Sequence, residues 1–275
     1  KKKELLDSAR EKRQWATINR SKKLRIVADR LERDAEKLEA DNPKDFVKDI
    51  KLNFNSKSLH NCSIFRLEDV SMKFDKQLFR NVNQEIEFGE KVCIIGDNGS
   101  GKSTLLKMLV GKLKPQKGNV SIRKNLEIGY FDQELSNVDK EQTLLEFLLK
   151  ETGKNEEKLI SSIYRYGFDK ELMHKEIKFF SGGEKGRINL LRIALGKQDV
   201  LVLDEPTNNL DIYLLESLEK AIKNFKGTVV FVSHDRYFVD QVATRILEIK
   251  NKKISSFSGN YTDFVEFKER NKGNY

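Results

Sequence analysis

The feature that most constrains this chain is a glycine-rich stretch of eight residues that directly follows a short apolar segment. Residues 96–103 read GDNGSGKS and fit the pattern G-x-x-x-x-G-K-[ST] in full, and residues 92–95 before them read VCII. The pattern binds phosphate where a strand precedes it and a helix follows, and residues 104–110 are expected to continue as that helix. The glycines let backbone N–H groups turn inward around an anion, and the start of the helix adds positive potential.

This phosphate loop predicts a site for a nucleoside triphosphate and its Mg²⁺ ion. Lys102 should reach the β- and γ-phosphates, and the hydroxyl of Ser103 should ligate the ion. The alternative, a glycine-rich turn that only precedes a helix, is disfavoured because every position of the pattern matches in the right context. The residues expected to contact the nucleotide here are Gly96, Asp97, Asn98, Gly99, Ser100, Gly101, Lys102, Ser103 and Thr104.

Two later apolar segments end in side chains that suit hydrolysis. Residues 200–203 (VLVL) are followed by Asp204 and Glu205, and residues 228–232 (TVVFV) are followed by Ser233 and His234. On the sheet of a phosphate-loop protein, Asp204 would hold Mg²⁺ through water and Glu205 would act as the general base. His234 would contact the γ-phosphate and orient the attacking water. Strand ends often carry acids and a lone histidine is usually structural, but a phosphate loop upstream favours the functional interpretation.

A second possible anion site lies further along the chain. Residues 181–187 (SGGEKGR) head a predicted helix that runs through Leu195, so Ser181 and the N–H groups after it can face an anion. The alternative is a structural helix cap, in which Glu184 completes a capping box with Ser181. The two interpretations are compatible, because one residue can cap a helix and bind phosphate.

Composition excludes several classes of protein. The chain carries 52 basic and 43 acidic residues, a net charge of +9, and 38% hydrophobic residues, enough to bury a core. No apolar run approaches the ~20 residues of a membrane span, and no secretory signal opens the chain. Cys62 and Cys93 cannot form a disulfide framework, so a reducing, cytoplasmic location is expected. No direct membrane insertion is expected.

The pattern of apolar residues changes along the chain. Short alternating runs in 63–90 predict antiparallel strands, and the later apolar bursts with helical segments between them predict a mostly parallel α/β sheet. Residues 136–180 are polar and helical and are interpreted as a helical insertion between two strands. The expected fold is therefore an α/β protein with a mixed core sheet.

The N-terminal part differs in charge. Residues 1–30 hold 11 basic and 4 acidic residues, and apolar residues recur through 24–38 at helical spacing. We expect 1–43 to form a charged helical arm that projects from the body, followed by a connecting segment, 44–62. The alternatives are a terminal helix packed on the core, and a solvated charged helix with no role in RNA binding.

With these motifs in order, the chain resembles an ABC ATPase cassette over roughly residues 63–268, with 269–275 as a polar tail. The resemblance implies a phosphate-loop fold with an antiparallel β-subdomain at 63–90 and a helical subdomain at 136–180. It also implies that Phe74 stacks on adenine, that Gln133 of the Gln loop (130–133, YFDQ) joins Ser103 at Mg²⁺, and that Asp211 belongs to the D-loop. The implied substrate is ATP, with Mg²⁺ as cofactor.

A narrower resemblance is to the ABC-F proteins. It rests on residues 205–208 (EPTN) followed by Leu210 and Asp211, on 233–238 (SHDRYF) and on 258–261 (SGNY). It implies a soluble protein with two cassettes in one chain that acts on the ribosome, through a helical linker that reaches toward tRNA. The 1–43 arm resembles that linker, so the chain would be the linker and second cassette. Asn209 and Phe180 depart from the commoner His and Leu and leave the subfamily open.

The family mechanism implies that ATP closes two cassettes head to tail. Lys102, Gln133, Glu205 and His234 would act on a nucleotide from one side. The signature residues would face the nucleotide of a second cassette, supplied by the full-length chain or by a homodimer; they are Ser181, Gly182, Gly183 and Glu184. A single cassette is therefore expected to hydrolyse ATP weakly.

Three functions follow from these features. The first is a ribosome-acting ATPase whose basic arm contacts rRNA or tRNA, with an affinity that falls steeply with salt. The second is the ATP-binding subunit of a membrane transporter, against which the long basic arm argues. The third is a helical nucleic-acid-binding protein without activity, against which the set of Lys102, Glu205 and His234 argues.

Overall fold

The computed structural model describes residues 8–15, 25, 28, 29, 32, 52, 54, 62–132, 138–208 and 210–271. The chain divides into two compact units, Lys1–Lys48 and Asp49–Tyr275, and each is described by itself. In the part of the chain that is described, no helix combines the length and the apolar composition needed to cross a bilayer.

The first unit is helical where it is described. Residues 8–15 form a helix, and the Arg13 guanidinium pairs with Asp29 at 2.5 Å and with Glu32 at 2.9 Å. Ala9 and Ala28 are fully buried. These contacts bring distant parts of the segment together, which indicates that its helices pack on one another. The remaining residues of the predicted 1–43 arm lie outside the described residues.

The second unit is built on a six-stranded sheet with the order β5-β6-β7-β3-β8-β9. Its first five strands are parallel, and the last hairpin adds one antiparallel edge strand. This confirms the predicted α/β fold with a mixed, mostly parallel sheet. The strands are β3 (Lys91–Gly96), β5 (Ile128–Phe131), β6 (Val200–Asp204), β7 (Thr228–Val232), β8 (Arg245–Lys250) and β9 (Lys253–Ser258).

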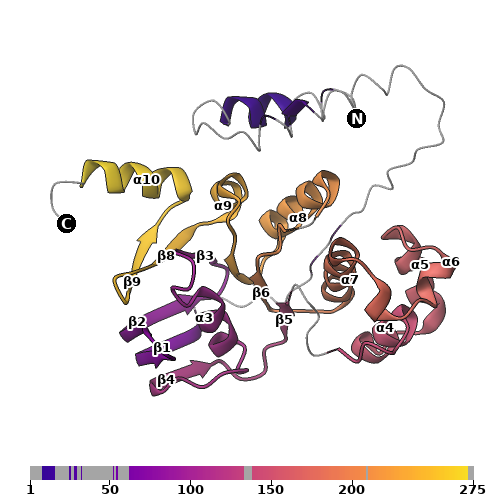
Figure 1. Cartoon of the computed structure of the whole chain (residues 1–275), viewed down its shortest axis with the longest axis horizontal. Coiled ribbons are helices and arrows are strands. Elements are labelled where there is room, and N and C mark those ends of the chain that lie inside the picture. The colour runs from indigo at the N-terminus through magenta and orange to yellow at the C-terminus, as the bar shows by residue number, and fades with distance from the viewer. Residues whose placement is uncertain are drawn as a thin grey trace. The chain divides into compact units, whose positions relative to one another are not determined.

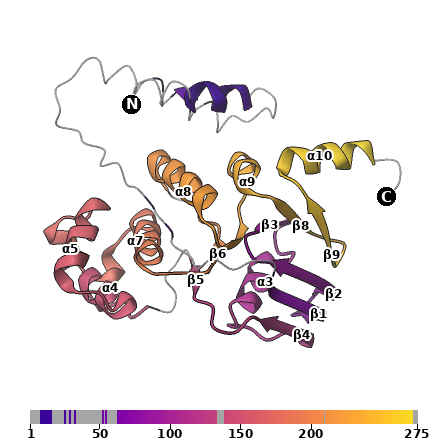
Figure 2. The ribbon, with the colours of Figure 1, turned by 180° about the vertical axis from the view of Figure 1, so that it is seen from behind.

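Both faces of this sheet are covered, which explains its continuous apolar strands. Alternate residues of β6 enter two different cores: Val200 and Val202 pack with α3, whereas Leu201 and Leu203 pack with α7, α8 and α9. Figures 1 and 2 show α3 on one side of the sheet and the other three helices on the opposite side. These helices, with the C-terminal α10, are α3 (Lys102–Leu109), α7 (Gly182–Leu195), α8 (Ile212–Asn224), α9 (Arg236–Val242) and α10 (Tyr261–Arg270).

A separate antiparallel sheet lies on the α3 side. Its order is β2-β1-β4, and it consists of β1 (Ser63–Lys73), β2 (Gln77–Glu87) and β4 (Lys117–Ile122). The antiparallel pair expected in 63–90 is present. The third strand, β4, was not predicted, because it contains no fully buried residue and so lacks an apolar pattern.

The segment between β5 and β6 forms a helical lobe, as the sequence predicted. It contains α4 (Leu144–Thr152), α5 (Glu156–Arg165), α6 (Lys170–Met173) and a 3-10 turn at Ile177–Phe179. Thr143 starts α4 with a capping box to Glu146, and Asn155 and Asp169 cap the next two helices. The apolar faces of these helices join the core that contains α7.

The predicted connecting segment, 44–62, is part of the second unit's core where it is described. Leu52 is buried and its N–H donates to Ser217 Oγ at 3.2 Å. The ring of Phe54 meets that of Phe225 edge to face, with centroids 6.0 Å apart. Ile50, Leu52 and Phe54 alternate with polar residues over only five positions, and the sequence analysis interpreted this short pattern as part of a connecting segment.

A buried lysine supports the start of the central strand. Lys91, at the beginning of β3, is only 7% exposed. Its ammonium group donates to the carbonyl oxygens of Phe225 at 2.9 Å and Gly227 at 2.5 Å, which lie just before β7. Burial lowers the pKa of Lys91 to about 8, with a contribution from nearby Lys226. This side chain thus joins two neighbouring strands at the edge opposite the phosphate loop.

We predict that Lys91→Met lowers the free energy of unfolding by about 1–3 kcal/mol, because two buried carbonyls lose a charged donor. Since the pKa is lowered from 10.5 to about 8, the unfolded chain binds this proton more tightly than the folded chain. The wild-type chain should therefore gain stability as pH rises from about 8 to 10.5, and the variant should lack this gain. Urea denaturation measures both effects. Exposed Lys114→Met is the control, and equal losses in both variants would contradict the role of Lys91.

Candidate active site

The phosphate loop lies between β3 and α3, as predicted. Gly101 is the N-cap residue of α3 and has a φ of 107°, in the left-handed region. A Cβ atom there would lie 3.0 Å from the ring of Phe79 in β2. Glycine is therefore required at this position both for the turn and for the close approach of the antiparallel sheet.

Lys102 is held inside the curve of this loop. Its ammonium group donates to the carbonyl oxygen of Gly96 at 2.9 Å and to that of Asp97 at 3.1 Å. These contacts place a positive charge beside the N-terminus of α3, where phosphate oxygens would be drawn. Of the nucleotide-binding residues predicted from sequence, those of 96–104 all lie in this one loop and the first turn of α3.

Ser103 and Asp204 come together from two different elements. Ser103, in the first turn of α3, donates to Asp204 Oδ1 at the end of β6 over 3.1 Å. Burial raises the pKa of Asp204, and the hydroxyl of Ser103 partly opposes this rise. A hydroxyl and a carboxylate oxygen side by side match the hard oxygen donors that Mg²⁺ prefers, so this pair fits the ion. The third predicted ligand, Gln133, lies outside the described residues.

Glu205 and His234 face each other across β6 and β7. The carboxylate accepts from the backbone N–H of His234 at 3.2 Å, and Glu205 Oε1 lies 3.3 Å from His234 Nε2. Oε1 is buried and makes no hydrogen bond among the described residues. The backbone of Glu205 has a φ of 50°, a strained conformation for this residue type. The two residues that the sequence singled out for hydrolysis thus lie side by side, and their roles remain predictions.

A buried hydrogen bond that was not predicted fixes the two turns behind this pair. Thr207 and Ser233 share a hydrogen bond of 2.9 Å between their hydroxyls, and both residues are buried. Ser233 Oγ also accepts from the N–H of Asp235, the N-cap of α9. The turn after Glu205 is thereby tied to the turn that carries His234.

Ser181 is the N-cap of α7 and forms a capping box with Glu184. This is the structural alternative to anion binding that the sequence left open. Its hydroxyl accepts from the N–H of Glu184 at 3.3 Å, and its own N–H donates to Glu184 Oε2 at 2.7 Å. The backbone N–H of Ser181 lowers the pKa of Glu184. Because the hydroxyl acts as an acceptor in this cap, its proton remains available to a further acceptor such as a phosphate.

The D-loop aspartate is linked to the same helix. Asp211 caps α8 through Leu214 and pairs with Arg187 of α7 at 3.0 Å. This ion pair connects helix α7 to the segment that follows Asp204 and Glu205. Asn209, two positions before Asp211, lies outside the described residues.

A polar network missed by sequence reasoning joins the signature helix to the end of β5. Arg192 donates to the carbonyl of Tyr130 at 2.5 Å and to Asn189 Oδ1 at 2.8 Å. The fully buried Asn189 in turn donates to the carbonyl of Asp132, the residue before Gln133. The one available signal was the three-residue spacing of Asn189 and Arg192, which puts both on one face of the helix.

Phe74 lies in the turn between β1 and β2, and its side chain is 56% exposed. An exposed aromatic ring at a turn is free to stack on a base. Its role toward adenine, which the family resemblance implies, remains a prediction.

Comparisons with known proteins agree with this geometry. A family model described as ABC transporter matches residues 79–208. The probable ATP-binding protein YbiT of Escherichia coli is 42% identical over 74% of this chain and 39% of its own length. ABC transporter F family member 5 of Arabidopsis thaliana is 37% identical over 80% of this chain and 32% of its own length. This chain belongs to the family of ABC ATPase cassettes.

Solved structures support the fold alone. The dimeric post-hydrolysis structure of the ATP-binding cassette MJ0796, bound to ADP and phosphate, has a TM-score of 0.60 and 23% identity. The match covers 71% of this chain and 98% of that one. The chain spans about a third of the length of the curated relatives described above, so it corresponds to one part of proteins of that size.

We predict that Lys102→Ala weakens MgATP binding at least about tenfold, because a charge-assisted contact to phosphate is lost. Isothermal titration calorimetry measures the affinity. Exposed Lys114→Ala, which removes the same charge beyond the end of α3, is the matched control. Unchanged affinity in a folded Lys102→Ala chain would remove this residue from the nucleotide site.

Proposed function

We propose that this chain is one cassette of an ABC-F-type ATPase that hydrolyses ATP to ADP and phosphate and acts on the ribosome. The observation that supports ATP hydrolysis is the environment of the Glu205 carboxylate. It is held by a strained backbone and the His234 N–H, with one buried oxygen that makes no hydrogen bond among the described residues. A carboxylate oriented in this way is suited to accept a proton from water.

Each residue of the site takes a role in this proposal. Lys102 binds the β- and γ-phosphates, Glu205 takes the proton of the attacking water, and His234 orients that water or the γ-phosphate. Ser103 and Asp204 hold Mg²⁺, with Gln133 as a further ligand. When bound, Mg²⁺ neutralises phosphate charge during phosphoryl transfer. Phe74 stacks on the adenine.

The position of the signature supports a pair of cassettes. Ser181 starts α7, whose apolar residues belong to the core on one side of the sheet, whereas α3 belongs to the core on the other side. The signature therefore heads a helix that does not share the layer of the phosphate-loop helix. We propose that Ser181–Glu184 face the nucleotide of a second cassette, and that ATP holds the two cassettes together by binding the closed state more tightly.

The second cassette belongs either to the same full-length protein or to a second copy. The first alternative is favoured because the chain spans 39% of YbiT and 32% of the F family member 5, which leaves room for another cassette. The closed pair would lie in the cytoplasm, the reducing compartment that suits the free thiols of Cys62 and Cys93.

The ribosomal part rests on the arm and on the resemblance to ABC-F proteins. Residues 1–30 carry a charge of 11 − 4 = +7, and the described part of this unit is helical. A basic helical segment is suited to RNA phosphates, and its attachment to an ATPase would let nucleotide state control binding. The alternative, a transporter subunit, is favoured by the description of the matching family model and by the name of a relative, the ABC transporter ATP-binding protein YfmR of Bacillus subtilis. It provides no role for the arm.

We predict that Glu205→Gln retains ATP binding but slows hydrolysis by about 10²–10⁴-fold, because the proton acceptor is lost while the phosphate contacts remain. Phosphate release from the full-length protein measures hydrolysis. Chromatography of the bound nucleotide shows whether ATP is retained. Asp235→Asn, a change at the N-cap of α9, is the control for charge loss nearby. Hydrolysis at the wild-type rate would reject Glu205 as the base.

We predict that the full-length Glu205→Gln protein, held in ATP, co-sediments with ribosomes and that binding falls as salt rises. Replacing Lys22, Lys23 and Arg25 with Ser should lower the slope of log affinity against log salt by roughly 2. Ser replacement of Lys150, Lys154 and Lys158, exposed in the helical lobe, is the matched control. No co-sedimentation at any salt concentration would reject the ribosomal proposal and favour the transporter alternative.

A further inference from the structure

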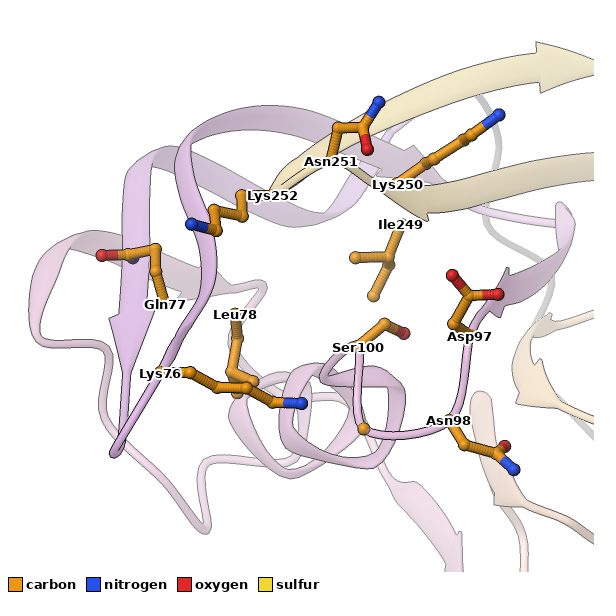
Figure 3. A pocket seen from close by; sticks show the side chains of 11 residues that line it. Lys76, Gln77, Leu78, Asp97, Asn98, Ser100, Ile249, Lys250, Asn251 and Lys252 are labelled. Atoms are coloured by element: carbon orange, nitrogen blue, oxygen red, sulfur yellow. The ribbon is translucent and has the colours of Figure 1, made fainter.

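A hollow of about 300 Å³ lies beside the phosphate loop and is separate from the catalytic residues. It is bounded by the first half of the loop, by the β1–β2 turn and by the β8–β9 turn (Figure 3). Its lining includes Asp97–Ser100, which are among the residues expected to contact the nucleotide, but none of Lys102, Ser103, Asp204 or Glu205. Gly99 of the phosphate loop lines the hollow, and a Cβ atom there would lie 3.4 Å from the ammonium group of Lys76.

The hollow is strongly basic. Lys76 comes from the β1–β2 turn, Lys250 from the end of β8 and Lys252 from the β8–β9 turn, against the single carboxylate of Asp97. None of these three lysines forms an ion pair with a residue that the structure describes. Uncompensated ammonium groups around a concavity attract anions. The amides of Gln77 and Asn251 add neutral hydrogen-bonding groups to the lining.

The backbone at Lys252 provides an independent indication of function. Asn251 and Lys252 form the two-residue turn of the β8–β9 hairpin, between the paired residues Lys250 and Lys253. Their φ values are 51° and 63°, so both adopt the left-handed conformation of a type I′ turn. Asparagine tolerates this conformation, but the second position ordinarily holds glycine, and lysine is strained there. Strain of this kind persists at sites that bind ligands.

The arrangement of the lysines indicates the kind of anion. Figure 3 shows their ammonium groups spread around the hollow and pointing in different directions, not toward one point. Such spacing suits successive phosphates of a chain better than a single free ion. No aromatic residue lines the hollow itself, and the exposed ring of Phe74 in the same turn as Lys76 is assigned to the adenine in the proposed function. The contacts available are those that recognise a nucleic-acid backbone.

We propose that this hollow binds backbone phosphates of RNA through Lys76, Lys250 and Lys252. That the phosphates belong to RNA rests on the proposed ribosomal function, whereas the phosphate site itself rests on the lysines and the turn. Because the hollow includes Asp97–Ser100 of the phosphate loop, RNA bound there would contact the element that holds ATP.

The first experiment measures binding of a fluorescent oligouridylate to the whole chain by anisotropy, with MgADP present in excess to fill the nucleotide site. Ser replacement of all three lysines should weaken binding about tenfold at low salt and lower the slope against log salt by about 2. The Lys150, Lys154 and Lys158 triple variant, which loses the same charge elsewhere, should bind like the wild type. Equal weakening in both triple variants would overturn the proposal.

A single substitution separates the functional role of Lys252 from a structural one. Lys252→Gly should weaken oligouridylate binding several-fold while the melting temperature rises or stays constant, because glycine suits the left-handed turn. If the lysine were structural, the melting temperature would fall. Binding that is unchanged in Lys252→Gly and in the triple variant would overturn the proposal.

Two further outcomes separate RNA from free phosphate as the ligand, and separate this inference from the proposed function. If inorganic phosphate binds and is lost in the triple variant, but the oligonucleotide does not bind, the site takes a free anion and the RNA assignment is wrong. If ribosomes co-sediment with the full-length protein and the Lys76, Lys250 and Lys252 variant binds them normally, this inference fails while the proposed function stands.

Discussion

The parallel pairing of β3, β6 and β7 is the constraint on which the site depends. Leu203 pairs with Phe231 and Phe231 with Cys93, so the three strands end at one edge of the sheet. The phosphate loop, the two carboxylates and His234 follow those ends and therefore meet in space. Every residue of Val200–Leu203 is buried. A shift in the register of this strand would move its side chains into the opposite cores, so packing of the sheet maintains the geometry of the site.

The same sheet also separates the two functional halves of the cassette. The phosphate-loop helix α3 packs on one face, and the signature helix α7 packs on the other. Two polar links tie α7 to the catalytic edge: Arg187 pairs with Asp211, and Arg192 donates to the carbonyl of Tyr130 in β5. Both links are partly buried, charge-assisted hydrogen bonds, which hold their partners in a defined geometry. The signature is therefore positioned by the strands that carry the site, although it lies in another layer.

The sequence predicted those parts of the molecule whose pattern is local. Residues 96–103 and the apolar runs before Asp204 and His234 identified the loop, the strands and the residues that meet at their ends. Features that depend on tertiary contacts were missed. Strand β4 has no fully buried residue, Lys91 acts through distant carbonyls, and Leu52 and Phe54 belong to a short alternating run whose packing partners lie far away in the sequence. The Gln133 prediction lies outside the described residues and remains a prediction.

Backbone strain connects the active site to the basic hollow. Six non-glycine residues in the described part of the chain have a positive φ, and four of them are Asn or Asp, which tolerate it. The other two are Glu205 and Lys252. For Glu205 the strain has an evident reason, because this backbone aims a carboxylate at the nucleotide edge. Lys252 follows the end of β8, which neighbours β3 in the same sheet, and it presents a cation where glycine would be less strained. Backbone strain therefore marks both the residue proposed as the general base and the lysine of the proposed phosphate site.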